Sequence, residues 1–483
     1  MGRWASSGEG RARVAMSART SYSLRLAAFY GALFTVYGVH LPYLPVWLDV
    51  RGLSAEQIAV ITAAPYFLRV FITPAVAMWA DGTGRHRALI NGLSWLALLL
   101  AALFAEAQGF WAILLLAVPF AIALSTAVPL TETIAVAGVR AHALDYGRMR
   151  LWGSITFVAA GFVGGWLIDR VGAGAVVGCI VVGMTATAAC AWLLPEHGSP
   201  APAETPVVAP RQRRVYGLDQ ARKLVASPIF LAFLLAAGAA QGAHGMFYAF
   251  GALAWHAQGI SNAWVGTLWA IAIAGEVALF AYSGNVVKRW GPVALLLAAT
   301  TASAVRWAVM SLSPPLAALI PLQTLHTLTY GASHLAAMHF ISRAVPEGAQ
   351  GTAQALYATV ASGLLMGGAT LFSGWLYARA GGHAYLAMAA LAGMGLAGAL
   401  GIRARWNGGL LWDRKSPNRT RGSLSPTTAT AADGAGRPRT APEDPGRGQA
   451  GAARRDRPSP PLAQRRTPAP RRATSPPSSP PSR

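Results

Sequence analysis

Several ionisable side chains lie inside long apolar stretches of this 483-residue chain, where a charge is costly. A charged group at the centre of a bilayer costs about 2.5–3.5 kcal/mol on insertion scales, so each one is a candidate for function. The set consists of Arg69, Glu132, Arg150, Glu276, Arg306, His326 and His334. Carboxylate, guanidinium and imidazole groups around one hydrated cavity can bind a polar solute and exchange a proton. The set therefore predicts Glu–Arg and Glu–Arg–His groups inside a membrane.

Glu276 and Arg306 are the strongest candidates, because both lie well inside their segments and neither can reach water along a helix end. Polar side chains at intervals of three and four predict a shared helix face in two other segments. They are Gln323, His326, Tyr330 and His334 in one segment, and Gln241, His244 and Tyr248 in the other. A structural role stays open for some: His244 or His334 could form only an interhelical hydrogen bond, and Arg69 could pair with a carbonyl.

The composition indicates a membrane protein. Apolar residues make up 54% of the chain and charged residues 12%, whereas Lys, Arg, Asp and Glu form about a quarter of a soluble domain. A helix needs roughly 20 mostly apolar residues to cross the bilayer. Twelve segments qualify, at about 24–47, 56–78, 88–106, 111–136, 149–168, 171–193, 228–252, 263–286, 292–312, 315–339, 352–377 and 383–402. We predict an all-α membrane protein with twelve transmembrane helices.

The two halves of the chain repeat each other at a distance of about 208 residues. The repeated residues are Gly165-Trp166-Leu167, Arg170 and Gly172 with Gly374-Trp375-Leu376, Arg379 and Gly381, and Trp47 and Gly52-Leu53-Ser54 with Trp255 and Gly259-Ile260-Ser261. Such repeats are typical of carriers. We predict six-helix bundles at 24–193 and 228–403, joined by a cytoplasmic linker at 194–227. A basic tail is predicted at 1–23, and a disordered basic Pro/Ser/Arg-rich cytoplasmic tail at 404–483.

The distribution of basic residues predicts the orientation. With the N-terminus inside, the short cytoplasmic loops hold twelve Lys or Arg residues and the outer loops hold three, Arg51, Arg170 and Arg379. Loops rich in Lys and Arg stay in the cytoplasm. The first apolar run is too long for a signal peptide and is predicted to be retained. We therefore expect a multi-pass protein of the cell (inner) membrane with both termini cytoplasmic.

Other classes of function have weak support in the sequence. From residue 404 onward, sixteen basic and five acidic residues supply half of the net charge of +22, and lipid headgroups explain this excess better than nucleic acid. Cys179 and Cys190 lie three helical turns apart, too far for a disulfide. Acidic clusters and His-rich boxes are lacking, so we expect no metal, no cofactor beyond a coupling proton, and no enzyme. A sensor that binds solute without moving it stays an alternative.

The segment that follows 56–78 resembles a known signature. Asp81-Gly82-Thr83-Gly84-Arg85-His86-Arg87 resembles the D-x-x-G-R-x-[RK] motif of the major facilitator superfamily, with Asp81, Gly84, Arg85 and Arg87 at its defining positions. An acid at a helix end beside basic residues can form a charge cluster that holds a gate closed. The resemblance implies the major facilitator fold and transport by alternating access.

A second resemblance concerns lactose permease. Asp145-Tyr146-Gly147-Arg148-Met149-Arg150-Leu151-Trp152-Gly153 is similar to the phrase that opens its fifth helix, and Glu132 precedes Arg150 by the same eighteen residues. His326 follows Arg306 by the same twenty residues, and Glu276 matches an acid of its eighth helix. This implies substrate binding by Glu132 and Arg150 and proton coupling by Glu276, Arg306 and His326. Two positions differ: Thr329 replaces a glutamate, and Phe157 replaces the sugar-stacking tryptophan.

The resemblance extends from about residue 24 to 402 for the phenylpropionate permease branch of the superfamily, which is related to lactose and nucleoside proton symporters. It is carried by Gly266-Thr267-Leu268-Trp269-Ala270, by Arg306-Trp307 and by the run 323–334. The branch implies proton symport of an aromatic or other carboxylic acid, such as phenylpropionate, by a monomer. Phe157, Gln241, His244 and His326 are then expected at the substrate, and His334 in proton coupling. Sugar or nucleoside symport, and proton-driven export, stay as alternatives.

Overall fold

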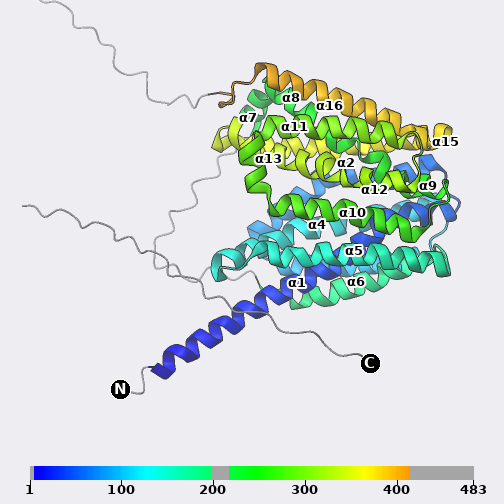
Figure 1. Cartoon of the computed structure of the whole chain (residues 1–483). Helices are drawn as coiled ribbons and strands as arrows, with labels where there is room; N and C mark the ends of the chain where they lie inside the picture. The colour runs from blue at the N-terminus through cyan, green and yellow to red at the C-terminus, as the bar shows by residue number, and fades with distance from the viewer. Residues whose placement is uncertain (1–4, 197–216, 413–483) are drawn as a thin grey trace, which may run out of the picture. The chain divides into compact units, whose positions relative to one another are not determined.

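The computed structural model describes residues 5–196 and 217–412, and this part of the chain is built from helices without β-strands (Figure 1). The first half forms six long helices. They are α1 (Ala5–Val50), α2 (Ala55–Thr83), α3 (His86–Phe104), α4 (Gly109–His142), α5 (Tyr146–Val171) and α6 (Ala175–Leu193). Each overlaps one predicted segment, although α1 begins within the predicted tail 1–23.

The second half is interrupted more often. Its elements are α7 (Gly217–Val225), α8 (Pro228–Gly242), α9 (Gly245–His256), α10 (Asn262–Ala281), α11 (Ser283–Met310), α12 (Leu316–Thr324), the π-helix η1 (Thr327–Ala332), α13 (Ser333–Ala344), the 3₁₀-helix η2 (Glu347–Ala349), α14 (Gln350–Tyr357), the π-helix η3 (Ala358–Leu365), α15 (Met366–Ala380), the 3₁₀-helix η4 (Gly381–Ala384) and α16 (Tyr385–Arg405). The short α7 lies within the predicted linker. Residues 197–216 of that linker and 413–483 of the predicted tail lie outside the described residues.

Ten helical stretches of the described chain are long and apolar enough to cross a membrane, whereas the sequence predicted twelve. The difference arises in two places. The predicted segment 315–339 is divided among α12, η1 and α13, each of them short. The stretch Glu347–Arg405 counts once, although a turn at Gly381 with φ 52° divides it. Large apolar side chains at the surface, such as Trp111 and Val182, suit contact with lipid rather than water.

The repeated loop motif adopts the same backbone in both halves. Gly52 and Gly259 have φ angles of 79° and 78°, a conformation that glycine adopts without steric cost. Ser54 and Ser261, which follow, are the N-caps of α2 and α10, and each side chain accepts a backbone N–H from the first helical turn. The repeat therefore encodes one helix–loop–helix joint that is made twice.

Helix ends gather at two faces of the described chain. We call the Arg51 face the end that carries the loops 51–54, 172–174, 257–261 and 381–384, and the Arg87 face the end that carries 84–85 and 143–145. At the Arg51 face, Arg51 donates to the carbonyl of Ala105 and Glu56 pairs with Arg379 at 3.5 Å. The loops that the repeat relates therefore meet at one end.

The two halves are joined at the Arg51 face and in the middle of the helices. In these two regions, α5 packs along α10, and α2 packs along α15. The backbones touch, because a Cβ atom on Gly266 would lie 2.3 Å from the carbonyl oxygen of Gly161. Nearest to the Arg87 face, Arg69 donates to the carbonyl of Ser362 at 2.9 Å. Between that bond and the Arg87 face, no hydrogen bond or ion pair joins the halves in the described ranges.

Candidate functional site

Arg306 of α11 lies at the centre of the second half, with none of its surface exposed. Its Nη1 donates to His326 Nδ1 and Thr329 Oγ1, both at 3.0 Å, and its Nη2 donates to Gln323 Oε1 at 2.7 Å. Its Cζ lies 4.5 Å from the ring centroid of Trp307, a cation–π distance. Within the described part of the chain, no carboxylate oxygen lies within 4.0 Å of Arg306. A full positive charge is therefore buried among neutral groups.

Glu276 of α10 reaches this charge through His326. Glu276 Oε1 lies 2.7 Å from His326 Nε2, although the two are not aligned as a hydrogen bond and Oε1 has no other partner. A guanidinium only donates, so His326 Nδ1 must accept from Arg306, and its Nε2 then carries the ring proton toward Glu276. The carboxylate, imidazole and guanidinium form a row, which we call the Glu276–His326–Arg306 row.

Thr329 connects this row to His244 at the break between α8 and α9. His244 Nδ1 lies 3.0 Å from the carbonyl oxygen of Ala240 and must donate to it. Its Nε2 therefore accepts from the Thr329 hydroxyl at 3.1 Å, while Thr329 accepts from Arg306. Gln241 lies one turn away and donates to Ser333 Oγ at 2.7 Å. The predicted residues His244, His326 and Arg306 thus belong to one buried polar network, and Gln241 lies beside it.

Aromatic rings form a wall beside the network. Phe247 stacks on Trp269 with centroids 4.8 Å apart, and Trp307 lies parallel to Tyr385 at 5.6 Å. Phe157 of α5 is buried, and its ring lies 6.3 Å from that of Trp269. Phe157 therefore adds to this wall from the first half, and the wall offers apolar surface and ring edges to an aromatic solute.

The π-helix η1 decides which residues of 316–344 meet the network. A π-helix bonds residue i to i+5, so its wider turn shifts the register of every residue beyond it. His326 precedes the π-helix and Thr329 lies within it, and both bond Arg306. His334, which regular helical spacing places on the same face, is exposed and lies more than 4.0 Å from any described carboxylate. The structure therefore leaves His334 outside the row.

Glu132 of α4 and Arg150 of α5 do not form a direct ion pair, since the described residues include no such contact within 4.0 Å. The Tyr146 hydroxyl donates to Glu132 Oε1 at 3.3 Å. The Arg150 guanidinium lies over the ring of Phe34, with Cζ 3.9 Å from the centroid. The Glu132–Arg150 pairing that the sequence suggested is thus replaced by a tyrosine contact and a cation–π contact.

The motif Asp81, Gly84, Arg85 and Arg87 lies at the Arg87 face. Gly84, with a φ of 69°, is the C-cap of α2, and the exposed Arg85 is the N-cap of α3. Asp81 lies 3.1 Å from His86. Arg87 pairs with Glu196 at 3.3 Å and donates to the carbonyl of Trp192 at 2.6 Å. All these described partners belong to the first half, so the motif ties α2 and α3 to α6.

Sequence reasoning missed the groups that join the halves at the Arg51 face. Asp169 accepts hydrogen bonds from the Asn262 and Ala263 backbones and from the Asn262 side chain, at 2.8–2.9 Å. The Tyr43 hydroxyl lies 2.7 Å from the carbonyl oxygen of Gly161 and 2.9 Å from that of Asn262. One signal was available: Asp169 interrupts the repeat, because Ala378 stands at the matching position.

The groups of this arrangement are able to exchange a proton and to attract an anion. Across residues 5–196 and 217–412, no group of three or more His, Cys, Asp or Glu side chains could hold a metal ion. The network instead offers one carboxylate, two imidazoles and a buried guanidinium beside aromatic rings. Such a site can change its charge by one proton and attract an anion or a hydrogen-bonding solute.

Comparisons with known proteins agree with a transport role. The profile of the MFS_1 like family matches residues 23–387. The chain is 32% identical over 369 residues to a probable 3-phenylpropionic acid transporter of Escherichia coli, which covers 76% of this chain and 94% of that protein. It is 28% identical over 352 residues to a maltose permease of Geobacillus stearothermophilus, with coverage of 73% and 86%.

Solved structures show the same fold. The nucleoside transporter NupG matches with a TM-score of 0.63 at 15% identity, covering 79% of this chain and 98% of that one. A bacterial homologue of the human lysosomal transporter Spinster, inward-facing and unoccupied, matches with a TM-score of 0.60 at 18% identity, covering 80% and 97%. Several apolar helices, the family match over most of the chain and the transporter relatives lead to one conclusion. The chain belongs to the MFS_1 like family of the major facilitator superfamily and is a multi-pass membrane transport protein, not an enzyme.

Proposed function

We propose that this protein is a proton-coupled symporter of a small organic acid, with an aromatic carboxylate such as 3-phenylpropionate as the favoured substrate. The observation that carries the proposal is the Glu276–His326–Arg306 row, in which a buried cation has only neutral contacts and a carboxylate lies one imidazole away. The substrate class is supported by the relative described as a probable 3-phenylpropionic acid transporter.

Glu276 is the proposed proton carrier. Burial favours its neutral form, while the positive charge of Arg306 favours the carboxylate, so a modest change nearby can shift the balance. When Glu276 is protonated, the row contains no anion to balance the positive charge of Arg306. An organic anion is then attracted more strongly, and by reciprocity a bound anion holds the proton more tightly. His334 is proposed to pass the proton between Glu276 and water, because it is exposed and close enough to interact with that carboxylate.

The substrate is proposed to lie between the two halves. The aromatic wall with Phe157 contacts its apolar part, and Gln241, His244 and His326 also contact the substrate. Glu132 and Arg150 orient it from the first half. The small-molecule substrate and the lipid bilayer are the proposed partners, the proton is the coupling ion without any other cofactor, and the working unit is a monomer.

The proposed architecture has twelve crossings in two six-helix bundles. It counts α12 with α13 as one crossing and divides Glu347–Arg405 at the Gly381 turn. The Arg87 face carries more basic residues and is proposed to be cytoplasmic, with both termini, in a bacterial inner membrane. Contacts between the halves at the Arg51 face and mid-helix, without any joining them near the Arg87 face in the described ranges, then correspond to an inward-facing state, from which the halves rock to the outward-facing state.

Glu276→Gln tests this proposal, because glutamine mimics the neutral acid and cannot release a proton. Purified protein in proteoliposomes is given an inward proton gradient and radiolabelled 3-phenylpropionate. One pH unit supplies about 1.4 kcal/mol per proton, so wild-type protein accumulates the acid up to about tenfold per unit at one proton per substrate. The variant is expected to lose accumulation but keep exchange of internal for external acid.

Glu347→Gln, an exposed change at the Arg87 face, is the matched control and should accumulate the acid as wild type does. Uphill uptake by the Glu276→Gln variant at the wild-type level would remove Glu276 from the mechanism. Absence of any acid transport by the wild type would refute the proposed function itself. Running the same vesicles with maltose and with uridine tests the sugar and nucleoside alternatives, and reversing the gradient tests export.

A further inference from the structure

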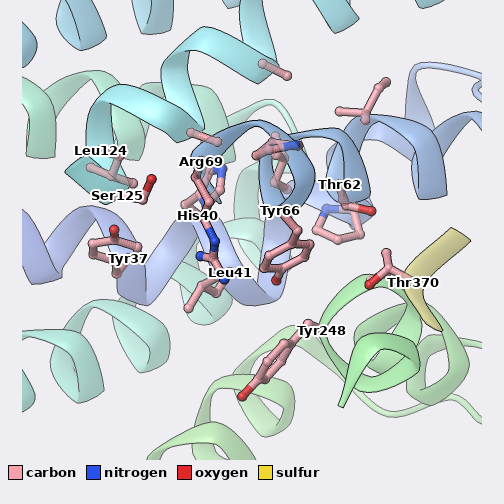
Figure 2. Close-up of a pocket in the computed structure, with 17 residues that line it drawn as sticks. Tyr37, His40, Leu41, Thr62, Tyr66, Arg69, Leu124, Ser125, Tyr248 and Thr370 are labelled. Atoms are coloured by element: carbon pink, nitrogen blue, oxygen red, sulfur yellow. The ribbon is translucent and has the colours of Figure 1, made fainter. Parts of the chain in front are cut away.

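A pocket with several polar side chains in its lining has no role so far, and it borders the buried network through Tyr248, whose ring lies 5.6 Å from that of His244. It is lined by α1, α2 and α4 of the first half and by Tyr248, Ala249 and Thr370 of the second (Figure 2). Its volume is about 110 Å³. None of the substrate or proton residues assigned above lines it.

Arg69 of α2 brings a positive charge to this pocket. Its Nη2 donates to the carbonyl of Ser362 at 2.9 Å, and its Cζ lies 4.6 Å from the ring centroid of Tyr66. That hydrogen bond uses one of five N–H donors of the guanidinium. No acidic side chain of the described chain lies within 4.0 Å of it. A partly buried cation without an acidic partner attracts an anion.

The walls around Arg69 carry further hydrogen-bonding groups. Tyr37, Tyr66 and Tyr248 line the pocket, and their hydroxyls form no hydrogen bond with described residues. His40 also lines it, and its Nδ1 is buried without a partner. In Figure 2 the Tyr37, His40 and Arg69 side chains gather on one side and Tyr248 lies across from them. Together they can surround a carboxylate with donors.

Most of the remaining lining is apolar and leads toward the aromatic wall. Leu41 and Leu124 are part of it. Tyr248 stacks on His244 with centroids 5.6 Å apart and lies 5.7 Å from Trp269. The pocket's volume of about 110 Å³ is small beside the 300–1,000 Å³ of sites for drug-sized ligands. The carboxylate of an acid with its first carbons suits a space of this size.

We infer that this pocket binds the carboxylate end of the organic acid, with Arg69 as its counter-charge and the body of the acid running past Tyr248 to Trp269. The inference rests on the proposed function and makes Arg69 its specificity determinant. The other two intramembrane arginines are less suited. Three donors of Arg306 are engaged by neutral side chains, and Phe34 lies 3.9 Å from the face of Arg150.

Isothermal titration of the purified full-length protein with 3-phenylpropionate and with 3-phenylpropan-1-ol tests the inference, because the two probes differ in the carboxylate. Wild-type protein is expected to bind the acid more tightly. Arg69→Gln should weaken acid binding about 10- to 100-fold, the range of a lost charge-assisted pair, and leave alcohol binding within about twofold. Arg170→Gln removes an exposed arginine of the Arg51 face and should leave both affinities unchanged.

Two further variants keep the test independent of folding. Arg69→Lys keeps the positive charge but lacks the planar guanidinium, and it should weaken binding of the acid less than Arg69→Gln does. Ser125→Leu fills the pocket while Arg69 stays in place, and it should weaken binding of the acid and of the alcohol to a similar extent. If Arg69→Gln keeps the wild-type preference for the acid, this inference is overturned while the proposed function stands. Wild-type protein that binds neither probe would overturn both.

Discussion

Asp169→Ala should shift the protein away from the conformation described above. Asp169 Oδ1 accepts from the Asn262 backbone at 2.9 Å and from its side-chain amide at 2.8 Å, and Oδ2 accepts from the Ala263 backbone at 2.9 Å. The carboxylate of one half thus caps the first turn of α10 in the other half. Because this contact needs the Arg51 ends of α5 and α10 to be together, it stabilises that conformation alone.

The size of the effect follows from the exposure of Asp169. Losing a side-chain cap costs about 0.5–2 kcal/mol, and a carboxylate at a helix N-terminus contributes about 0.3–1 kcal/mol through the helix dipole. Water can replace part of the lost contact, because Asp169 is exposed. We therefore expect a loss of about 1–2 kcal/mol, which changes the ratio of closed to open Arg51 faces about 5- to 30-fold.

Double electron–electron resonance between spin labels can measure this ratio of closed to open Arg51 faces. Spin labels at Val171→Cys and Gln258→Cys report the separation of the α5 and α9 ends at the Arg51 face, after Cys179 and Cys190 are replaced by serine. Asp169→Ala should raise the population at long distance.

Glu106→Gln is the control, because it removes an exposed acid of the same face that forms no ion pair within the described chain. An unchanged distance distribution in Asp169→Ala, or an equal shift in Glu106→Gln, would show that the cap does not hold the face closed.

Two other predictions concern packing and buried polarity. Gly266→Val should hold the Arg51 face open and slow uptake about 5- to 100-fold, since its Cβ would meet Gly161 and overpacking costs about 1–3 kcal/mol; Gly178→Val, in open space, should transport normally in the same vesicle assay. Thr329→Val should destabilise the protein by about 1–3 kcal/mol, because His244 loses its donor. Thermal unfolding in detergent checks this, and Thr329→Ser should retain stability; equal melting of the valine and serine variants would contradict the assigned network.

The repeat and the charged set could be predicted from the sequence because both are read directly along the chain. Gly52 and Gly259 supply a positive φ, and Ser54 and Ser261 then cap the helices that follow. The lengths of the apolar segments predicted the helices of the first half and most of those in the second half. The resemblance to lactose permease, with the same twenty residues between the two positions, implied that Arg306 and His326 act together, and the two side chains are hydrogen-bonded.

The tertiary structure decided the rest. A π-helix changes register through backbone bonds that residue type does not reveal, so spacing alone did not show that Thr329, within that π-helix, would bond Arg306. The Asp169 cap, the contact of Gly161 with Gly266 and the Arg69 pocket each join residues from both halves of the chain. The free energies of these contacts depend on how two helices far apart in sequence approach each other. The membrane topology, in contrast, depends mainly on the transfer of each segment from water to lipid. The sequence alone therefore determined that charges are buried in a repeated helical membrane protein, and the packing of the halves decided which of those charges meet.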